Sequence, residues 1–174
     1  MIPAHAPESS VLSTDRLRLR PARCDDLDDM HHLVNETSVC RFLFDNRRRS
    51  REEVCEMLSA SERRFEDTGT GLWALQTRAG EGLIGFLCLR PFHDERGNEL
   101  AFALSSVHWG KGYALEAGAA LIGYVRERLG WKSVQASTDL CNNRSIRTLW
   151  RLEFVESSII HGPAGPLRVF KRMF

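Results

Sequence analysis

The chain has 174 residues, of which 43% are hydrophobic, and its formal net charge is +1. A chain of this length fits one compact domain and can bury roughly two thirds of its extended surface. The balanced charge argues against a protein built mainly to hold nucleic acid and against an acidic disordered tail. We therefore expect a single domain over residues 1–174, with residues 1–10 as a flexible polar lead-in.

The cysteine pattern and the absence of long apolar runs bear on the cellular compartment. Five cysteines are scattered through the chain without a Cys-x-x-Cys pair, so neither a disulfide framework nor a structural zinc site is expected. No apolar run reaches the length of a membrane span, and the first residues lack the apolar stretch of a signal peptide. These features favour a cytoplasmic protein that uses neither a metal nor a membrane.

The first elements expected along the chain are a strand and a helix. Residues 12–20 contain the alternating Leu-Arg-Leu-Arg typical of a half-buried strand, and Pro21 ends the pattern. Asp25 and Asp26 then open a helix whose apolar residues recur at helical spacing as far as Val34. Acidic residues in a first turn suit the helix dipole.

A second helix is expected after a basic segment. Ser50 has the character of an N-cap, with Glu53 three residues later as in a capping box, and Gly69 and Gly71 close the helix. The preceding run, Arg47–Arg51, has two interpretations: it attracts an acidic substrate or RNA, or it is a solvated loop. The solvated loop is the simpler one, because runs of charge usually lie on the surface.

The rest of the chain alternates strands and helices. Three strands are expected over 72–77, 83–89 and 100–107, with a hairpin connection at 93–98. They are followed by a helix from Gly112 to about Leu129, a strand at 134–137, a helix over 142–152 and two strands within 154–174. Because helices interleave with strands that look antiparallel, we predict an α/β (α+β) fold, with a mixed, twisted central sheet and helices on both faces.

The most informative segment joins a strand to the long helix: Trp109, Gly110, Lys111, Gly112, Tyr113 and Ala114. Two glycines there leave backbone N–H groups unobstructed, and the helix start adds its positive dipole end. Together they suit a pyrophosphate without a dedicated charged side chain. The segment matches neither the nucleotide-hydrolysing P-loop nor Gly-x-Gly-x-x-Gly. An ordinary glycine-rich turn is the alternative.

A second informative segment, Asn142–Phe154, follows the next strand. Together the two segments resemble the GNAT superfamily of N-acetyltransferases, with its Gln/Arg-x-x-Gly-x-Gly/Ala loop and its later Asn-x-x-Ser/Ala helix. The resemblance extends to residues 99–104 and 12–20, so it covers nearly the whole chain. It is greatest to the branch that acetylates the N-termini of ribosomal proteins (RimJ/RimL type), of which Trp109 and Ser145 are features.

This resemblance implies a GNAT-like fold and an activity. The protein would move an acetyl group from acetyl-coenzyme A to a primary amine by direct attack, without an acyl-enzyme and without a metal. The acceptor would be a protein N-terminal α-amine or a small-molecule amine. A homodimer is compatible with the sequence. The rival class is a non-catalytic module that binds coenzyme A, or RNA through the arginine run.

The resemblance also implies which residues hold the donor. Backbone N–H groups of the glycine loop would bind the pyrophosphate, and the end of the preceding strand would face the pantetheine arm through its backbone. Arg147 could meet a phosphate or water, and Asn142 suits both a cap and a cofactor contact. The cofactor-binding residues expected are Ala103, Leu104, Ser105, Val107, Trp109, Gly110, Lys111, Gly112, Tyr113, Ala114, Asn142 and Arg147.

Two residues are candidates for proton transfer. Glu99 matches an acidic position of the branch and is the candidate general base; its alternative is a solvated strand-end glutamate. Ser145 is the candidate general acid; its alternative is a capping residue. The chain departs from the family at Leu149, where many members have a tyrosine acid, and at Glu153, where a glycine is usual.

Overall fold

The computed structural model of the protein describes residues 10–80, 82–92, 97–162 and 165–174. Most of the expected lead-in and parts of two expected connections, at 1–9, 93–96 and 163–164, lie outside the described residues. The helices are α1 (Leu27–Val34), α2 (Thr37–Leu43), α3 (Arg51–Thr68), α4 (Tyr113–Glu127) and α5 (Asn143–Arg151), with 3-10 turns η2 (Cys24–Asp26) and η3 (Ser106–His108). The strands are β1 (Leu12–Ser13), β2 (Leu17–Pro21), β3 (Leu72–Thr77), β4 (Gly85–Pro91), β5 (Asn98–Leu104), β6 (Ser133–Asp139), β7 (Val155–Gly162) and β8 (Gly165–Met173).

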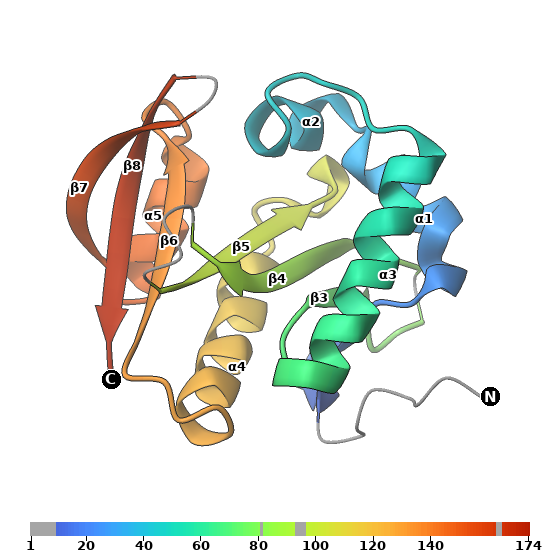
Figure 1. The fold of residues 1–174 in the computed structure, drawn as a ribbon, viewed down its shortest axis with the longest axis horizontal. Helices are drawn as coiled ribbons and strands as arrows, with labels where there is room; N and C mark the ends of the chain where they lie inside the picture. Colours follow the sequence, from blue (N-terminus) through green and yellow to red (C-terminus); the bar gives the residue numbers. More distant parts are fainter. Residues whose placement is uncertain (1–9, 81, 93–96, 163–164) are drawn as a thin grey trace.

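Within this part of the chain the strands form one sheet of eight, in the order β1-β2-β3-β4-β5-β6-β8-β7. Every neighbouring pair is antiparallel except β5 and β6, which run parallel. The mixed sheet predicted from the sequence is thus confirmed. Its twist is visible in Figure 1, where β4 lies nearly horizontal and β8 nearly vertical.

The sheet buries apolar side chains on both of its faces, because successive residues of a strand point to opposite sides. On β3, Trp73 and Leu75 join a core with α4 and α5, whereas Leu72 and Ala74 join a core with α1, α2 and α3. Helices therefore cover both faces, as the sequence predicts (Figure 1).

The N-terminal segment is a hairpin and not the single strand expected over 12–20. β1 and β2 pair antiparallel, and Thr14 makes the turn between them. The Thr14 N–H donates to the Leu17 carbonyl at 2.9 Å, and the Thr14 hydroxyl oxygen accepts from the Leu17 N–H at 3.0 Å. This side-chain bond offers the backbone an alternative to the ladder, which is why the strand breaks here.

The start of α3 follows the capping residues that the sequence shows. The Ser50 hydroxyl oxygen accepts from the Glu53 N–H at 3.2 Å, and the Glu53 carboxylate accepts from the Ser50 N–H at 2.9 Å. The predicted capping box is confirmed, and Gly69 ends the helix in the left-handed conformation. The sequence signals do not predict α2, because a helix of seven residues with Val39 and Cys40 buried shows too little periodicity.

The turn into β7 keeps a conformation typical of glycine although it holds another residue. Glu153 lies where the resemblance leads one to expect glycine, and its φ is 61°, in the left-handed region. Its carboxylate forms an ion pair with Arg172 at 2.8 Å. The residue change therefore leaves the left-handed turn after α5 in place.

β5 ends earlier than the strand predicted over 100–107. The Ser105 N–H makes the last backbone bond on the β4 side, to the Ile84 carbonyl at 3.0 Å, and the chain then turns into η3. In the ranges that the structure describes, no strand pairs with the chain beyond Leu104, so the ladder stops there. The expectation that Val107 belongs to the strand is wrong, and 71% of its side chain is exposed.

Candidate active site

A cleft opens where β5 and β6 diverge. In the described residues the two strands pair at Glu99 and Gln135 and then separate toward their carboxyl ends (Figure 1). The space belongs to a cleft of about 580 Å³. Its walls come from β5, β6, α2, the loop before α4, the first turn of α4, the length of α5, and the end of β7 with the start of β8. A cleft of this volume suits a small-molecule ligand.

The separation of the strands frees one backbone edge of β5. Polar backbone groups of an antiparallel strand alternate between its two sides. Because the Ser105 N–H bonds to Ile84 on the β4 side, the groups of Phe102 and Leu104 face the side toward β6. β6 has already turned away at that level, so the Phe102 and Leu104 N–H groups point into the cleft.

The loop before α4 presents further backbone donors. Gly110 and Gly112 have φ of 76° and 81°, which glycine adopts without steric cost. Within the described residues, the N–H groups of residues 110–113 have no hydrogen-bond acceptor. They lie at the N-terminus of α4, where the helix carries partial positive charge. Such an arrangement binds an anion, a phosphate above all.

Most of the residues predicted to bind the cofactor meet around this cleft. Those that line it are Ala103, Leu104, Trp109, Gly110, Gly112, Tyr113, Ala114, Asn142 and Arg147, together with Glu99 and Ser145. Ser105, Val107 and Lys111 do not line it. The Ser105 N–H is bound to Ile84, and the Lys111 side chain is exposed.

Trp109, in the loop before α4, contacts both β5 and α5. Its indole N–H donates to the Leu104 carbonyl at 2.9 Å, which fixes the loop against the end of β5. The Arg144 guanidinium lies 4.8 Å from the centre of the indole ring, in cation–π contact, and brings in the start of α5. The two contacts link the loop to the end of β5 and to the start of α5.

The start of α5 offers one unpaired hydroxyl to the cleft. The Asn142 side chain caps the helix by accepting from the Ser145 N–H at 3.2 Å. The Thr148 hydroxyl donates to the Arg144 carbonyl at 3.0 Å, whereas the described residues give the Ser145 hydroxyl no partner. Leu149 is buried, 1% exposed, and has no proton to give. Of the two α5 hydroxyls that line the cleft, Ser145 and Thr148, that of Ser145 is the one without a partner in the described residues.

Glu99 lies at the foot of the cleft, where β5 and β6 last touch. It is 2% exposed, which excludes the alternative interpretation of Glu99 as a solvated residue at the end of a strand. Its Oε2 accepts from Arg90 Nε at 2.9 Å and its Oε1 from the Ser137 hydroxyl at 2.5 Å. Each carboxylate oxygen is thus fixed by one partner, and the carboxylate still borders the cleft.

One wall of the cleft, formed by α2 and the turn after it, is not predicted by the sequence. α2 and the turn after it contribute Ser38, Phe42 and Asp45, opposite Asp139 at the end of β6. Burial raises the pKa of Asp139, and the charge of Asp45 raises it further. The two carboxyl groups therefore act on each other across this side of the cleft, and the charge of Arg41 opposes the effect of Asp45.

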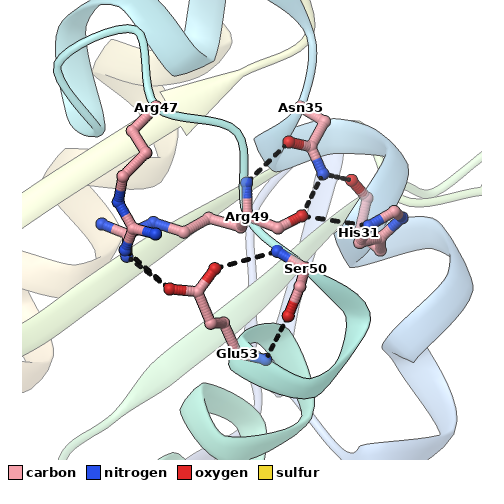
Figure 2. A network of polar contacts seen from close by, with 6 residues as sticks. All are labelled: His31, Asn35, Arg47, Arg49, Ser50 and Glu53. Atoms are coloured by element: carbon pink, nitrogen blue, oxygen red, sulfur yellow. Dashed lines mark hydrogen bonds and ion pairs between the residues drawn. The ribbon is translucent and has the colours of Figure 1, made fainter.

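The arginine run forms a fixed connection between α2 and α3 (Figure 2). The Asn35 side chain accepts from the Arg49 N–H at 2.9 Å and donates to the Arg49 carbonyl at 3.0 Å. His31 Nε2 donates to the same carbonyl at 3.1 Å, and Arg47 forms an ion pair with Glu53 at 2.6 Å. Several of these guanidinium groups remain exposed, as a solvated loop requires, but the backbone at Arg49 is fixed by its bonds to Asn35.

Two features are absent from the described part of the chain. No group of three or more His, Cys, Asp or Glu side chains there could hold a metal ion. No helix in those same ranges is long and apolar enough to cross a membrane. All five cysteines lie within them and are free thiols.

A family model for the acetyltransferase (GNAT) domain matches residues 16–155. The chain therefore belongs to the GNAT family of acetyltransferases. Among curated relatives, YoaA of Bacillus subtilis (strain 168), an uncharacterized N-acetyltransferase, is 24% identical over 153 residues, which are 86% of this chain and 85% of YoaA.

Solved structures share the fold. RimL, a ribosomal L7/L12 α-N-protein acetyltransferase in complex with coenzyme A, superposes with a TM-score of 0.79 at 15% identity, over 94% of this chain and 97% of RimL. MccE, a microcin C7 self-immunity acetyltransferase in complex with acetyl-CoA and AMP, gives 0.78 at 12% identity, over 92% and 94%. At such identities the likeness shows the fold and leaves the acceptor open.

Proposed function

We propose that the protein moves the acetyl group of acetyl-coenzyme A to a primary amine. The observation that carries this proposal is the cleft, where unpaired N–H groups of the loop before α4 and the free edge of β5 face one space. The loop would bind the pyrophosphate, and the β5 edge would bind the pantetheine arm. The coenzyme A and acetyl-CoA bound to RimL and MccE support the same donor.

The reaction proposed is a direct attack. The amine nitrogen bonds to the thioester carbonyl carbon, the carbon–sulfur bond breaks, and the thiolate leaves and takes up a proton. An N–H group of Phe102 or Leu104 would polarise the carbonyl oxygen as negative charge develops on it. No covalent enzyme intermediate is needed.

Two side chains would move the protons. Glu99 is the proposed general base; because both of its oxygens already accept hydrogen bonds, it would take the ammonium proton through a water molecule in the cleft. The unpaired Ser145 hydroxyl would donate a hydrogen bond to the departing thiolate at the start of α5.

Ser145→Ala should lower kcat/KM by roughly tenfold or less, the effect of one neutral hydrogen bond. The loss should be the same for acceptors of high and low pKa, because the lost bond goes to the leaving group. Coenzyme A affinity should not change. Steady-state kinetics with a series of amines measure this, with Thr148→Val as the matched control, since the Thr148 hydroxyl is already bound to a carbonyl. A loss that tracks the acceptor pKa would rule out the assigned role.

The acceptor proposed is a protein N-terminal α-amine, with a small-molecule amine as the alternative. The likeness to RimL supports the first, and the carboxyl groups of Asp45 and Asp139 suit any cationic amine that approaches from the α2 side. The free cysteines support a reducing, cytoplasmic location.

A thiol-release assay with acetyl-coenzyme A and a panel of N-terminal peptides and small amines tests the proposal. We expect release that depends on the acceptor, with kcat/KM ranking the panel. Calorimetric binding of coenzyme A without release toward any acceptor would contradict the proposal and favour the non-catalytic module.

A further inference from the structure

A cluster of polar contacts joins the N-terminal hairpin to the loop before α4. Arg16 Nε donates to Glu116 Oε2 at 2.7 Å, and Arg16 Nη1 donates to the Lys111 carbonyl at 2.9 Å. The Arg16 N–H and the Thr14 hydroxyl both donate to Glu116 Oε1, at 3.0 and 2.5 Å. The Arg16 guanidinium also lies 4.8 Å from the centre of the Tyr113 ring.

The bond to the Lys111 carbonyl fixes the orientation of one peptide in the loop. In a trans peptide the C=O and the following N–H point in opposite directions. With the Lys111 carbonyl turned toward Arg16, the Gly112 N–H points away from Arg16, and Gly112 lines the cleft. Glycine populates both signs of φ, so the residue alone does not select this orientation. The contact with Arg16 does.

The same cluster balances a charge that would oppose an anion. Glu116 lies in the first turn of α4, where a carboxylate stabilises the helix but repels a phosphate. Partial burial opposes its ionisation, but the hydrogen bonds from Thr14 and Arg16 outweigh burial and lower the pKa of Glu116, so it is charged at neutral pH. The Arg16 guanidinium compensates that charge at an Nη2–Oε2 distance of 2.5 Å.

We propose that Arg16 is a positioning residue for the donor: held by Glu116 and Thr14, it presets the Lys111–Gly112 peptide so that the Gly112 N–H meets the pyrophosphate. The inference rests on the proposed function, in which this loop binds the pyrophosphate. Arg16 does not itself line the cleft, so it acts through the loop.

Binding of coenzyme A by calorimetry and steady-state kinetics test this role in the full-length protein. Arg16→Gln should raise the Kd for coenzyme A and the KM for acetyl-CoA about tenfold. It should leave kcat at saturating donor within about twofold, because the reacting atoms are untouched. Arg16→Lys, which keeps the charge and one donor, should recover part of the affinity. Arg18→Gln is the matched control: Arg18 lies on the same hairpin, is exposed and loses the same charge.

A double variant separates peptide orientation from charge. If Arg16 acted by neutralising Glu116 alone, Arg16→Gln combined with Glu116→Gln would restore parent affinity; that result would overturn the proposal. An affinity as weak as that of Arg16→Gln supports it. Arg16 is half-exposed, and a thermal melt checks that each variant folds. A parent that binds coenzyme A as tightly as Arg16→Gln overturns this inference alone, whereas a parent that binds none overturns the proposed function.

Discussion

Gly110→Asp should weaken coenzyme A binding at least about tenfold, a cost of about 1.4 kcal/mol, whereas Gly110→Asn should weaken it far less. A Cβ at Gly110 meets nothing within 4 Å, so both side chains begin in open space. Asp and Asn are nearly isosteric, and both tolerate the left-handed backbone that this position requires. The difference between the two variants is therefore the negative charge beside the pyrophosphate.

Gly112→Asp tests the same loop and also perturbs Arg16. A Cβ there would lie 3.4 Å from Arg16 Nη2, so the new carboxylate would sit inside the loop and compete for the guanidinium. Isothermal titration of coenzyme A into parent and variants, after a thermal melt for each, gives the ratios. Parent-like affinity in folded Gly110→Asp and Gly112→Asp would mean that the pyrophosphate binds elsewhere.

The glycine loop and the helix after it could be predicted because their signals are local. The long helix expected after Gly112 begins at the next residue, Tyr113, and the two glycines before it have positive φ. Likewise Ser50 and Glu53 cap α3 through residues three apart. Capping and left-handed turns depend on a few neighbouring residues, which is why a single sequence contains them.

What the sequence could not predict depends on partners far along the chain. β5 ends where the neighbouring strand β4 no longer provides acceptors for its N–H groups. That limit depends on β4, so residues 100–107 alone do not show that Val107 lies outside the strand. The contacts of Arg16 with Glu116 span a hundred positions, and no local pattern indicates them. The same holds for Ser137, which reaches Glu99 from the neighbouring strand.

The part of the cleft formed by α2 could not be predicted for a different reason. The helix is short, and its cleft-facing residues, Phe42 among them, show no period that separates them from a loop. The connection from α2 to α3 is fixed by the contacts of Asn35 and His31 with Arg49, in an arginine run whose sequence suggests surface charge alone (Figure 2). The α2 side of the cleft is thus the part that is hardest to predict from the sequence.

Glu99→Gln should lower kcat/KM by roughly a hundredfold at neutral pH, within the usual range of a general-base contribution. The amide can keep both contacts of the carboxylate: its oxygen can accept from Arg90, and its NH2 can donate to the Ser137 hydroxyl oxygen. The shape of the cleft is then preserved while the ability to accept the ammonium proton is lost. Coenzyme A affinity should survive.

The loss in Glu99→Gln should shrink as pH rises, because free amine becomes abundant and no longer needs a base. A role in merely holding β5 against β6 predicts a different pattern. Ser137→Ala removes one contact of Glu99 but leaves its carboxylate, so a structural role would give both variants similar, pH-independent losses. A catalytic role gives a large, pH-dependent loss in Glu99→Gln and a small loss in Ser137→Ala.

The deciding measurement is a pH–rate profile of kcat/KM for parent, Glu99→Gln and Ser137→Ala on one acceptor. If the profile of Glu99→Gln parallels that of the parent at every pH, Glu99 does not take the proton, and binding of the already neutral amine is the better account. If the two profiles converge at high pH, the missing function is proton removal. The buried carboxylate then works through water, because its own oxygens are already bound to Arg90 and Ser137.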